Sequence, residues 1–310
     1  MQQQIIDPGT GEKYFGQTKR LINKDGSFNV VKTGADLNTK DLYHFLITIS
    51  WTKFFLLVVL AYIVLNIFFS LLYFLMGAGS LIATRGVSQN IYLKLMVFSF
   101  QTFTTVGYGN IYPDGVGVDI IAAFEALTGL MSFALFTGLL YGRFSKPTPK
   151  ILYSQKAIVA PYQGINALQF RVANQRKNNV IELEARVLAA LTEENFKKKY
   201  YELKLERYSV TFFPLSWTVV HPMDEDSPLS QFPLDELEKR QLEVMILMKG
   251  FDETFSQVVY STHSYTFDEI VWGAKFQNAF ATTPKGDVVL NLKNLHLFDE
   301  LEKQEAEKNI

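Results

Sequence analysis

Two stretches of this chain carry no charged side chain, and this feature constrains the fold more than any other. The stretches are residues 54–84 and residues 126–142. The apolar run at 54–76 is long enough to cross a membrane, because a helix needs about 20 predominantly apolar residues to span the hydrocarbon core. A second run of sufficient length covers residues 118–141. The sequence therefore predicts two transmembrane helices.

The distribution of Lys and Arg predicts how these helices are oriented. The segment between the two runs holds only Arg85 and Lys94, whereas basic residues precede the first run and follow the second. Because cytoplasmic loops carry the excess of Lys and Arg, we expect both termini in the cytoplasm and residues 77–117 outside. The expected location is a cell (inner) membrane.

The outward segment holds a further apolar stretch at residues 91–103. At about 1.5 Å per residue, a helix of this length is too short to cross the bilayer. Non-helical backbone at membrane depth is tolerated only inside protein or along a water-filled cavity. A short helix followed by Gly-rich backbone between two spans is typical of a re-entrant pore loop.

The end of this loop reads Thr104-Thr105-Val106-Gly107-Tyr108-Gly109. From Thr105 onward it matches the potassium-channel filter TVGYG letter for letter. A dehydrated K⁺ needs a cage of oxygens, and Gly107 and Gly109 allow the φ > 0 backbone that turns successive carbonyls to one side. We expect K⁺ to bind at Thr105, Val106, Gly107 and Tyr108. The short helix and the flanking spans argue against a chance pentapeptide.

One chain supplies one wall of such a pore. A closed pore needs several copies about an axis, and we expect a homotetramer with cyclic symmetry.

Residues 38–49 form an amphipathic pattern before the first span. Leu42, Phe45, Leu46 and Ile49 recur at helical spacing among polar residues. This predicts an interfacial (slide) helix at the inner membrane surface. A cytosolic helix packed on the soluble domain is the alternative.

After the Pro-containing linker at 145–150, the sequence becomes typical of a soluble β protein. Apolar residues alternate at 181–187 and 201–205, and residues 161–164 form a turn signal. We expect a cytoplasmic all-β, immunoglobulin-like sandwich. Short helices are expected near 234–242 and after Phe298. The predicted domains are residues 1–50, 51–145 (the two-helix pore domain) and 146–310.

The chain resembles the prokaryotic inward-rectifier potassium channels (KirBac type) over roughly residues 36–290. Beyond the filter, the similarity is carried by five strings: residues 125–129 (EALTG), 143–147 (RFSKP), 215–222 (LSWTVVHP), 224–229 (DEDSPL) and 268–273 (DEIVWG). The resemblance implies a homotetrameric membrane protein whose pore continues into a cytoplasmic vestibule.

The resemblance also suggests roles on the second span. Tyr141 matches the aromatic residue that narrows the inner-helix bundle crossing, and Phe133 and Thr137 share its helix face. A Tyr of the interfacial aromatic belt is the alternative. Gly129 matches the inner-helix hinge, although a small residue for close packing fits equally. Glu125 matches a hydrogen-bonded carboxylate that supports the filter from behind.

In the cytoplasmic pore, Glu182 matches an acidic ring that attracts polyamines or Mg²⁺, while an ordinary exposed strand residue is the alternative. Gly250 and Phe251 begin the segment that matches the second constriction. Strong rectifiers carry acids at the positions of Phe133 and Lys249, so we expect weak rectification at most. Because rectification is a voltage-dependent block, we group the chain with voltage-gated channels.

Arg143, Lys146 and Lys150 follow the second span, and Arg176 comes from the soluble domain. By resemblance these residues contact anionic membrane lipids. Ordinary basic residues of the cytoplasmic side are the alternative.

Other classes of function fit less well. A net charge of −1 gives no basic field for nucleic acid, and the chain has no Cys and four scattered His. We therefore expect no enzyme, no cofactor and no nucleic-acid partner. A nonselective cation channel remains an alternative, as does a membrane-anchored β-sandwich that binds a partner.

Overall fold

The computed structural model describes residues 8–9, 20–31, 33, 42–77, 79–84, 90–147, 149–193 and 197–301. The chain divides into two compact units. One unit, the helical unit, is residues 34–146, and the other, the sandwich unit, combines residues 1–33 with 147–310. The helical unit is thus inserted in the sequence between two parts of the sandwich unit, and each is described by itself.

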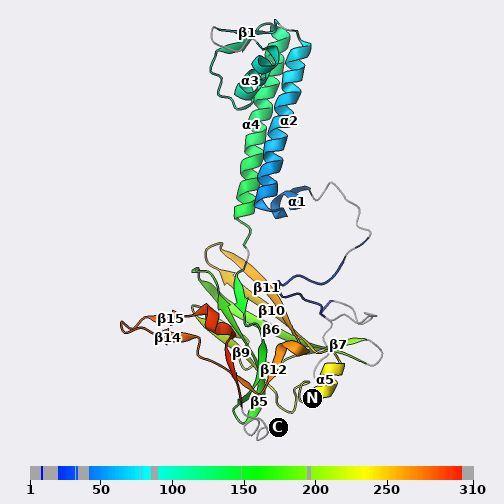
Figure 1. The fold of residues 1–310 in the computed structure, drawn as a ribbon, viewed down its shortest axis with the longest axis vertical. Coiled ribbons are helices and arrows are strands. Elements are labelled where there is room, and N and C mark those ends of the chain that lie inside the picture. The colour runs from blue at the N-terminus through cyan, green and yellow to red at the C-terminus, as the bar shows by residue number, and fades with distance from the viewer. Residues whose placement is uncertain are drawn as a thin grey trace. The chain divides into compact units, whose positions relative to one another are not determined.

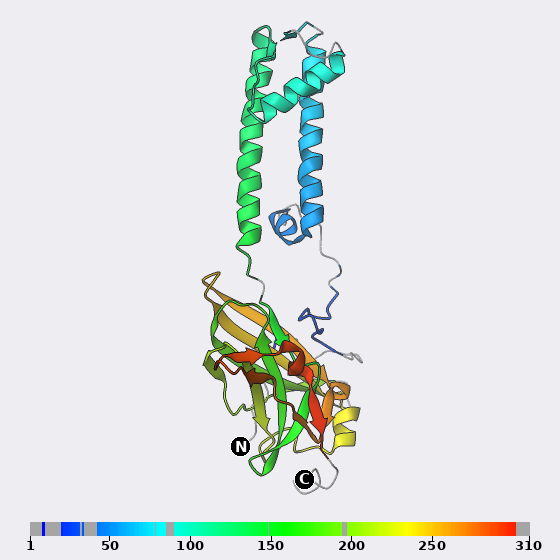
Figure 2. The same cartoon turned by 60° about the vertical axis from the view of Figure 1, so that its left-hand side comes forward.

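The described residues of the helical unit form the helices α1 Leu42–Thr48, α2 Trp51–Leu75, α3 Ile91–Phe103 and α4 Val116–Phe144 (Figure 1). Within the described residues, α2 and α4 are the two helices that are long and apolar enough to cross a membrane. The short helix α3 packs against both of them near one end (Figure 2). Strands β1 (Leu81–Ala83) and β2 (Ile111–Pro113) pair antiparallel beside it.

A small apolar core holds α3 between the two long helices. It includes Phe69 and Tyr73 from α2, Leu95 and Phe98 from α3, and Val118 from α4. Most other apolar side chains of α2 and α4 are exposed in the single chain. Such surfaces suit helices that face lipid or further copies of the chain.

The sandwich unit is built from two five-stranded sheets. The first has the order β11-β10-β6-β7, with β8 also paired to β6, and the second has the order β12-β4-β5-β3, with β9 also paired to β5. The first sheet consists of β6 Val180–Thr192, β7 Lys198–Glu202, β8 Ser209–Phe212, β10 Glu243–Asp252 and β11 Gln257–Thr266. The second consists of β3 Ile151–Tyr153, β4 Ala157–Tyr162, β5 Ile165–Asn174, β9 Ser216–Pro222 and β12 Ile270–Trp272.

Smaller elements complete the unit. They are α5 Leu234–Lys239, the 3₁₀ helices Phe267–Glu269 and Leu292–His296, the pair β13 Ala274–Phe276 and β16 Phe298–Glu300, and the hairpin β14 Phe280–Thr282 and β15 Val288–Leu290.

The core of the sandwich lies between the two sheets, as the alternating patterns predict. Leu183, Ala185 and Val187 of β6 face Leu168 and Phe170 of β5, and all five are buried. The alternating pattern therefore arises because one face of each strand packs on the core and the other face is exposed.

The turn expected at 161–164 joins β4 to β5. Tyr162 pairs with Ile165, and both intervening residues have positive φ, 50° at Gln163 and 87° at Gly164. This is the pattern of a type I′ hairpin, whose twist matches that of the flanking strands.

Residues 20–29 form an N-terminal hairpin that belongs to the sandwich unit. Ile22 and Phe28 make an antiparallel bridge. The side chains of Leu21 and Ile22 are buried in a cluster with Tyr200 and Met245 of the first sheet. The amino-terminal segment is therefore docked on the sheet over these residues.

Within the described residues of the sandwich unit, two segments differ from the sequence expectations. The strand expected through residue 205 ends at Glu202, because the chain then crosses from one sheet to the other: Leu203 N donates to Val187 O, and Glu206 N donates to Val220 O. The stretch after Phe298 begins as strand β16 rather than as a helix. Residues 38–41 of the expected slide helix and residues 302–310 of the tail lie outside the described residues.

Candidate functional site

The segment predicted to be the filter alternates between positive and negative backbone φ. Thr105, Gly107 and Gly109 have φ values of 58°, 52° and 76°, while Val106 and Tyr108 are not in the positive-φ region. Left-handed backbone is strained for a non-glycine residue such as Thr105 and persists where the surrounding structure imposes it. Alternation of this kind turns successive carbonyls toward the same side, which is the arrangement that a row of K⁺ ligands needs.

The N–H groups of the filter are held by the end of α3. Val106 N and Gly107 N both donate to Gln101 O, at 3.0 and 3.4 Å, and Thr105 N donates to Thr102 O at 3.0 Å. The amides therefore turn back toward the helix, which leaves the carbonyl oxygens to the opposite side.

The helix α3 covers the residues predicted from the sequence and is capped at its start. The side chain of Asn90 accepts from Tyr92 N and Leu93 N, at 3.0 and 3.4 Å. Its carboxyl end leads directly into Thr104 and the filter. The partial negative charge of a helix C-terminus favours a cation at that end.

Glu125 lies on α4 with no solvent exposure. Its carboxylate accepts hydrogen bonds from Tyr73 Oη of α2 and Ser99 Oγ of α3. Ser99 Oγ is also within hydrogen-bond distance of Asn66. The carboxylate therefore joins three helices behind the pore loop, as a buried polar group must when its hydrogen-bond capacity is to be satisfied.

Gly129 lies where α4 passes the carboxyl end of α3. A Cβ atom built on this glycine would lie 1.9 Å from Phe103 O and 2.8 Å from Phe103 C. Helix α4 is continuous through this position. Of the two roles open to Gly129 on sequence, the contact supports close packing.

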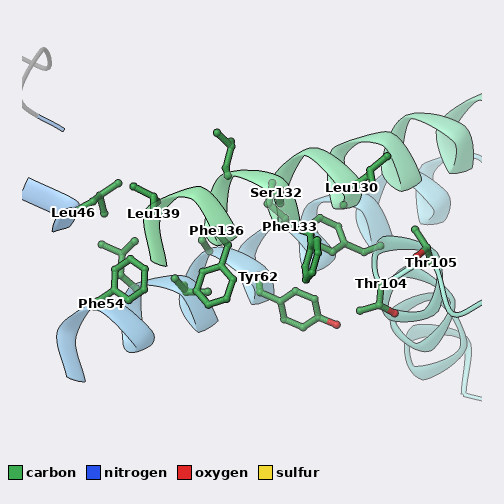
Figure 3. A pocket seen from close by; sticks show the side chains of 17 residues that line it. Leu46, Phe54, Tyr62, Thr104, Thr105, Leu130, Ser132, Phe133, Phe136 and Leu139 are labelled. Carbon is green, nitrogen blue, oxygen red and sulfur yellow. The ribbon is translucent and has the colours of Figure 1, made fainter. Parts of the chain in front are cut away.

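The inner half of α4 presents a row of exposed side chains. Phe133 and Tyr141 are 69% and 73% exposed, and Thr137 between them is exposed as well. Phe133 also lines a cavity of about 770 Å³ between α2, α4 and the end of α3, whereas Thr137 and Tyr141 do not. Figure 3 shows Thr104 and Thr105 at the filter end of this cavity and Leu46, Phe54 and Leu139 at the other.

Arg143, on the last turn of α4, is buried rather than directed to solvent. Its guanidinium donates to Leu46 O of α1 and, at 2.6 Å, to Ile49 O. The rings of Trp51 and Phe54 lie 4.5 Å from it. The side chain thus contacts α1 and α2 within one chain, which differs from the lipid contact suggested by the resemblance.

The other basic candidates are placed differently. Lys146 and Lys150 are exposed, and Arg176 lies 5.7 Å from the ring of Phe255. Thr148, which lies between Lys146 and Lys150 in the sequence, is outside the described residues.

Glu182 is exposed on β6 with φ of 50°, at an irregularity in the pairing with β10. Lys249 pairs with Glu184 and Phe251 with Ile181, so Glu182 is part of a β-bulge opposite Gly250. A bulge re-aims the side chains of the strand that carries it. Lys249 Nζ lies 3.2 Å from Glu184 Oε2.

Two buried groups that the sequence did not single out hold the N-terminal hairpin. The carboxylate of Glu243, fully buried, accepts from Leu21 N at 2.8 Å and from Ile22 N at 3.1 Å. Lys198 Nζ lies 3.6 Å from the same carboxylate, and burial lowers the pKa of Lys198. Arg20 and Lys24 both make ion pairs with Glu269. No local sequence signal marks Glu243 and Glu269 as partners of the hairpin, because each lies more than 200 residues from the hairpin residues that it contacts.

Comparisons with known proteins agree with this architecture. The family described as "Inward rectifier potassium channel C-terminal domain" matches residues 151–308, and the family described as "Ion channel" matches residues 54–146. Inward rectifier potassium channel Kirbac3.1 of Paramagnetospirillum magnetotacticum is 32% identical over 292 residues, which cover 92% of this chain and 98% of that protein. G protein-activated inward rectifier potassium channel 3 of Homo sapiens is 26% identical over 286 residues, which cover 83% and 72%.

These relatives are ion channels and not enzymes, and in such a channel K⁺ is the permeant ion. The grouping with voltage-gated channels is not supported, because the matches are to inward rectifiers. With its two spans, its pore loop and its β-rich C-terminal domain, the chain belongs to the inward rectifier potassium channel family.

Proposed function

We propose that this chain forms a K⁺-selective pore as a homotetramer, with K⁺ held by the oxygens of Thr105, Val106, Gly107 and Tyr108. The observation that carries the proposal is the alternating backbone of residues 105–109, directly after a short helix and between two spans. Carbonyls turned to one side replace the hydration shell of the ion. The pore lies in a cell (inner) membrane with both termini in the cytoplasm.

The exposure of the filter side chains supports assembly of several copies. Val106 and Tyr108 are 52% and 77% exposed in the single chain. A filter needs these side chains packed in order to hold its carbonyls at fixed distances, and neighbouring copies supply that packing. Four chains about one axis complete the pore.

The gate of this proposal is the row Phe133, Thr137 and Tyr141. These side chains are exposed on one face of α4, so four copies bring four rings toward the axis. A constriction lined by rings closes the pore by excluding water.

Weak rectification follows from the charges of the cytoplasmic pore. Glu182 is the acidic group that attracts polyamines or Mg²⁺. Lys249 places a positive charge 3.2 Å from Glu184. Phe133 contributes no carboxylate to the pore. Fewer free carboxylates bind a cytoplasmic polycation less strongly.

Anionic lipids regulate the gate through the exposed Lys146 and Lys150, with Arg176 as a further contact. Basic residues just inside a membrane are attracted to anionic head groups, by about 1 kcal/mol each.

The test is ⁸⁶Rb⁺ uptake into liposomes that contain the purified full chain. We expect uptake driven by K⁺, preserved in excess Na⁺ and blocked by Ba²⁺. Uptake that Na⁺ abolishes would identify a nonselective cation channel. If the wild type is silent, Tyr141→Ala removes the proposed constriction, and silence of that variant as well would contradict the proposal.

A further inference from the structure

The helical unit holds an apolar cavity between its two long helices. The volume of the cavity is about 770 Å³, within the range of about 300–1,000 Å³ that is typical of ligand pockets. Residues between 54 and 65 of α2 form one wall, and residues between 129 and 139 of α4 form the other. Leu46 of α1 borders one end, and Thr104 and Thr105 border the other (Figure 3). The cavity therefore runs along the long helices, from α1 to the pore loop.

The lining is suited to hydrocarbon rather than to water. Among the described residues that line the cavity, none is charged, and the polar side chains are those of Tyr62, Thr104, Thr105 and Ser132. The hydroxyl of Thr104 is already used, because it donates to Phe100 O at 2.6 Å. A buried water molecule needs about two to four polar partners, whereas the end of the cavity at Leu46, Phe54 and Leu139 presents apolar side chains (Figure 3).

The cavity has the depth of one leaflet of a bilayer. Phe54 lies in the first turn of α2, and the backbone rises about 16 Å along the helix from Phe54 to Leu65. Half of a hydrocarbon core of about 30 Å is about 15 Å. The distribution of Lys and Arg places this end of α2 at the cytoplasmic face. An acyl chain of the inner leaflet therefore has a length that matches the cavity.

A space of this size needs contents in the assembled protein. Packed interiors hold few voids larger than a water molecule, because atoms that line a void lose their dispersion contacts. The lining side chains Leu57, Leu130 and Leu135 are 38%, 61% and 68% exposed in the single chain. The contents therefore come from outside this chain, and the two sources are lipid and the side chains of a neighbouring copy.

The wall formed by α2 favours lipid as the source. In the proposed tetramer the row Phe133, Thr137 and Tyr141 of α4 faces the axis, so α2, across the cavity, lies farther from that axis. On the faces of α2 that do not line the cavity, Leu56 and Leu60 are 68% and 58% exposed. A helix that is apolar all round is surrounded by an apolar medium. Hydrocarbon chains of the bilayer are therefore the apolar molecules nearest to this wall.

We propose that the cavity binds one acyl chain of an inner-leaflet phospholipid. The head group stays at the membrane surface beside α1, and the methyl end of the chain lies below the pore loop at Thr104. The bound chain fills the space between α2 and α4, so the site selects lipid by its hydrocarbon tail rather than by the charge of its head group. The inference rests on the proposed function, which places these helices in the membrane and the row of α4 at the axis.

The experiment places a tryptophan in the cavity and measures its quenching by bromine atoms on acyl chains. Tyr62→Trp puts the indole near the pore loop, where Tyr62 stacks on Phe100 with ring centroids 5.6 Å apart. Trp51→Phe removes the native tryptophan of α2, and the other two, Trp217 and Trp272, belong to the sandwich unit. The full chain is reconstituted in phosphatidylcholine vesicles whose acyl chains carry bromine near the methyl end or near the head group.

Two neighbouring valines of α2 give a matched pair of variants. Val58 lines the cavity, whereas Val59 does not and is 52% exposed. We expect bromine near the methyl end to quench the tryptophan of Tyr62→Trp more than bromine near the head group. Val58→Phe should reduce this quenching at least about threefold, because a ring and an acyl chain overpack the same space. Val59→Phe should leave the quenching as it was.

Gel filtration checks that each variant assembles. Phe136→Trp, which also replaces an aromatic ring of the lining, is the second reporter if Tyr62→Trp does not assemble. Absence of quenching at both reporters would overturn the proposal, because a neighbouring copy would then occupy the cavity. Equal quenching in Val58→Phe and Val59→Phe would overturn it as well, because the tryptophan would then meet lipid outside the cavity.

The quenching measurement needs no ion flux. Absence of selective ⁸⁶Rb⁺ uptake in wild type and in Tyr141→Ala would therefore contradict the proposed function, while the pair Val58→Phe and Val59→Phe would still decide whether the cavity binds an acyl chain.

Discussion

Gly129 of α4 lies against the carboxyl end of α3, and the space there is too small for a side chain. Gly129→Ala would place a methyl carbon 1.9 Å from Phe103 O, a backbone atom that cannot swing aside. Overpacking of this kind costs typically 1–3 kcal/mol or more. We expect Gly129→Ala to reduce K⁺-selective ⁸⁶Rb⁺ uptake at least about tenfold. Gly138→Ala, on the same helix in open space, is the control and should leave uptake within about twofold. Equal behaviour of the two variants would refute the packing role.

A second residue-scale prediction concerns His263, which is buried against the ring of Tyr153 at a centroid distance of 4.4 Å. Burial lowers the pKa of His263 from 6.5 to about 4, and its neighbours Arg20, Lys24 and Glu269 partly cancel one another. Because the unfolded chain binds this proton near pH 6.5 and the folded chain only near pH 4, the folded state loses stability as the pH falls through that window. Between pH 6.5 and 5 the loss amounts to about 2 kcal/mol.

The measurement is the thermal midpoint of the full chain in detergent between pH 7.5 and 5. We expect His263→Gln to flatten the fall in the midpoint, although its stability at pH 7.5 is lower. His221 and His296, whose pKa values burial also lowers, contribute to the slope in the same direction. A slope that His263→Gln leaves intact would show that the proton binds elsewhere.

At the scale of elements, the bulge in β6 separates two carboxylates that look alike in the sequence. Glu182 belongs to the bulge, whereas Glu184 pairs with Lys249 at 3.2 Å. Glu182→Gln should therefore raise the Mg²⁺ or spermine concentration for half-maximal block by roughly threefold or more, since a tetramer loses four charges from its pore. Glu184→Gln should change the block less. Patch-clamp recording from fused liposomes with blocker on the cytoplasmic side measures both, and identical block in wild type and Glu182→Gln would exclude this ring.

Elements with a local signature could be predicted from the sequence. The pore helix Ile91–Phe103 has the predicted bounds, because apolar length and the following TVGYG mark both its limits. Both spans were predicted within three residues of α2 and α4 at each end. The strand end at Glu202 could not be predicted, because Leu203 and Leu205 remain buried and continue the alternating pattern while the backbone crosses to the other sheet. The hydrogen bonds of Arg143 to Leu46 O and Ile49 O have no local signature either, since these acceptors lie 97 and 94 residues away.

At the scale of the whole molecule, the chain passes between the two units twice: once after the N-terminal hairpin and once after α4. Glu243 accepts the two N–H groups of Leu21 and Ile22 beside the buried Lys198. Glu243→Gln leaves Lys198 without its charge partner, and breaking a buried pair in this way costs about 3–5 kcal/mol. We expect the hairpin to detach, so that trypsin cleaves after Arg20 and Lys24 about tenfold faster or more.

The control for this prediction is Glu193→Gln, which breaks the more exposed ion pair with Lys199. It should leave cleavage after Arg20 and Lys24 unchanged. Retained far-UV circular dichroism in Glu243→Gln separates detachment of the hairpin from loss of the sandwich. Wild-type cleavage rates in Glu243→Gln would mean that other contacts hold the hairpin by themselves.

The docking of the hairpin also sets an order of events during biosynthesis. Leu21 and the Glu243 carboxylate that receives it are 222 residues apart, so the ribosome needs about 10–45 s to make the acceptor after the donor has emerged. Both membrane spans lie between them and leave the ribosome first. The hairpin can therefore dock on Glu243 only after both spans have left the ribosome, although it precedes them in the sequence.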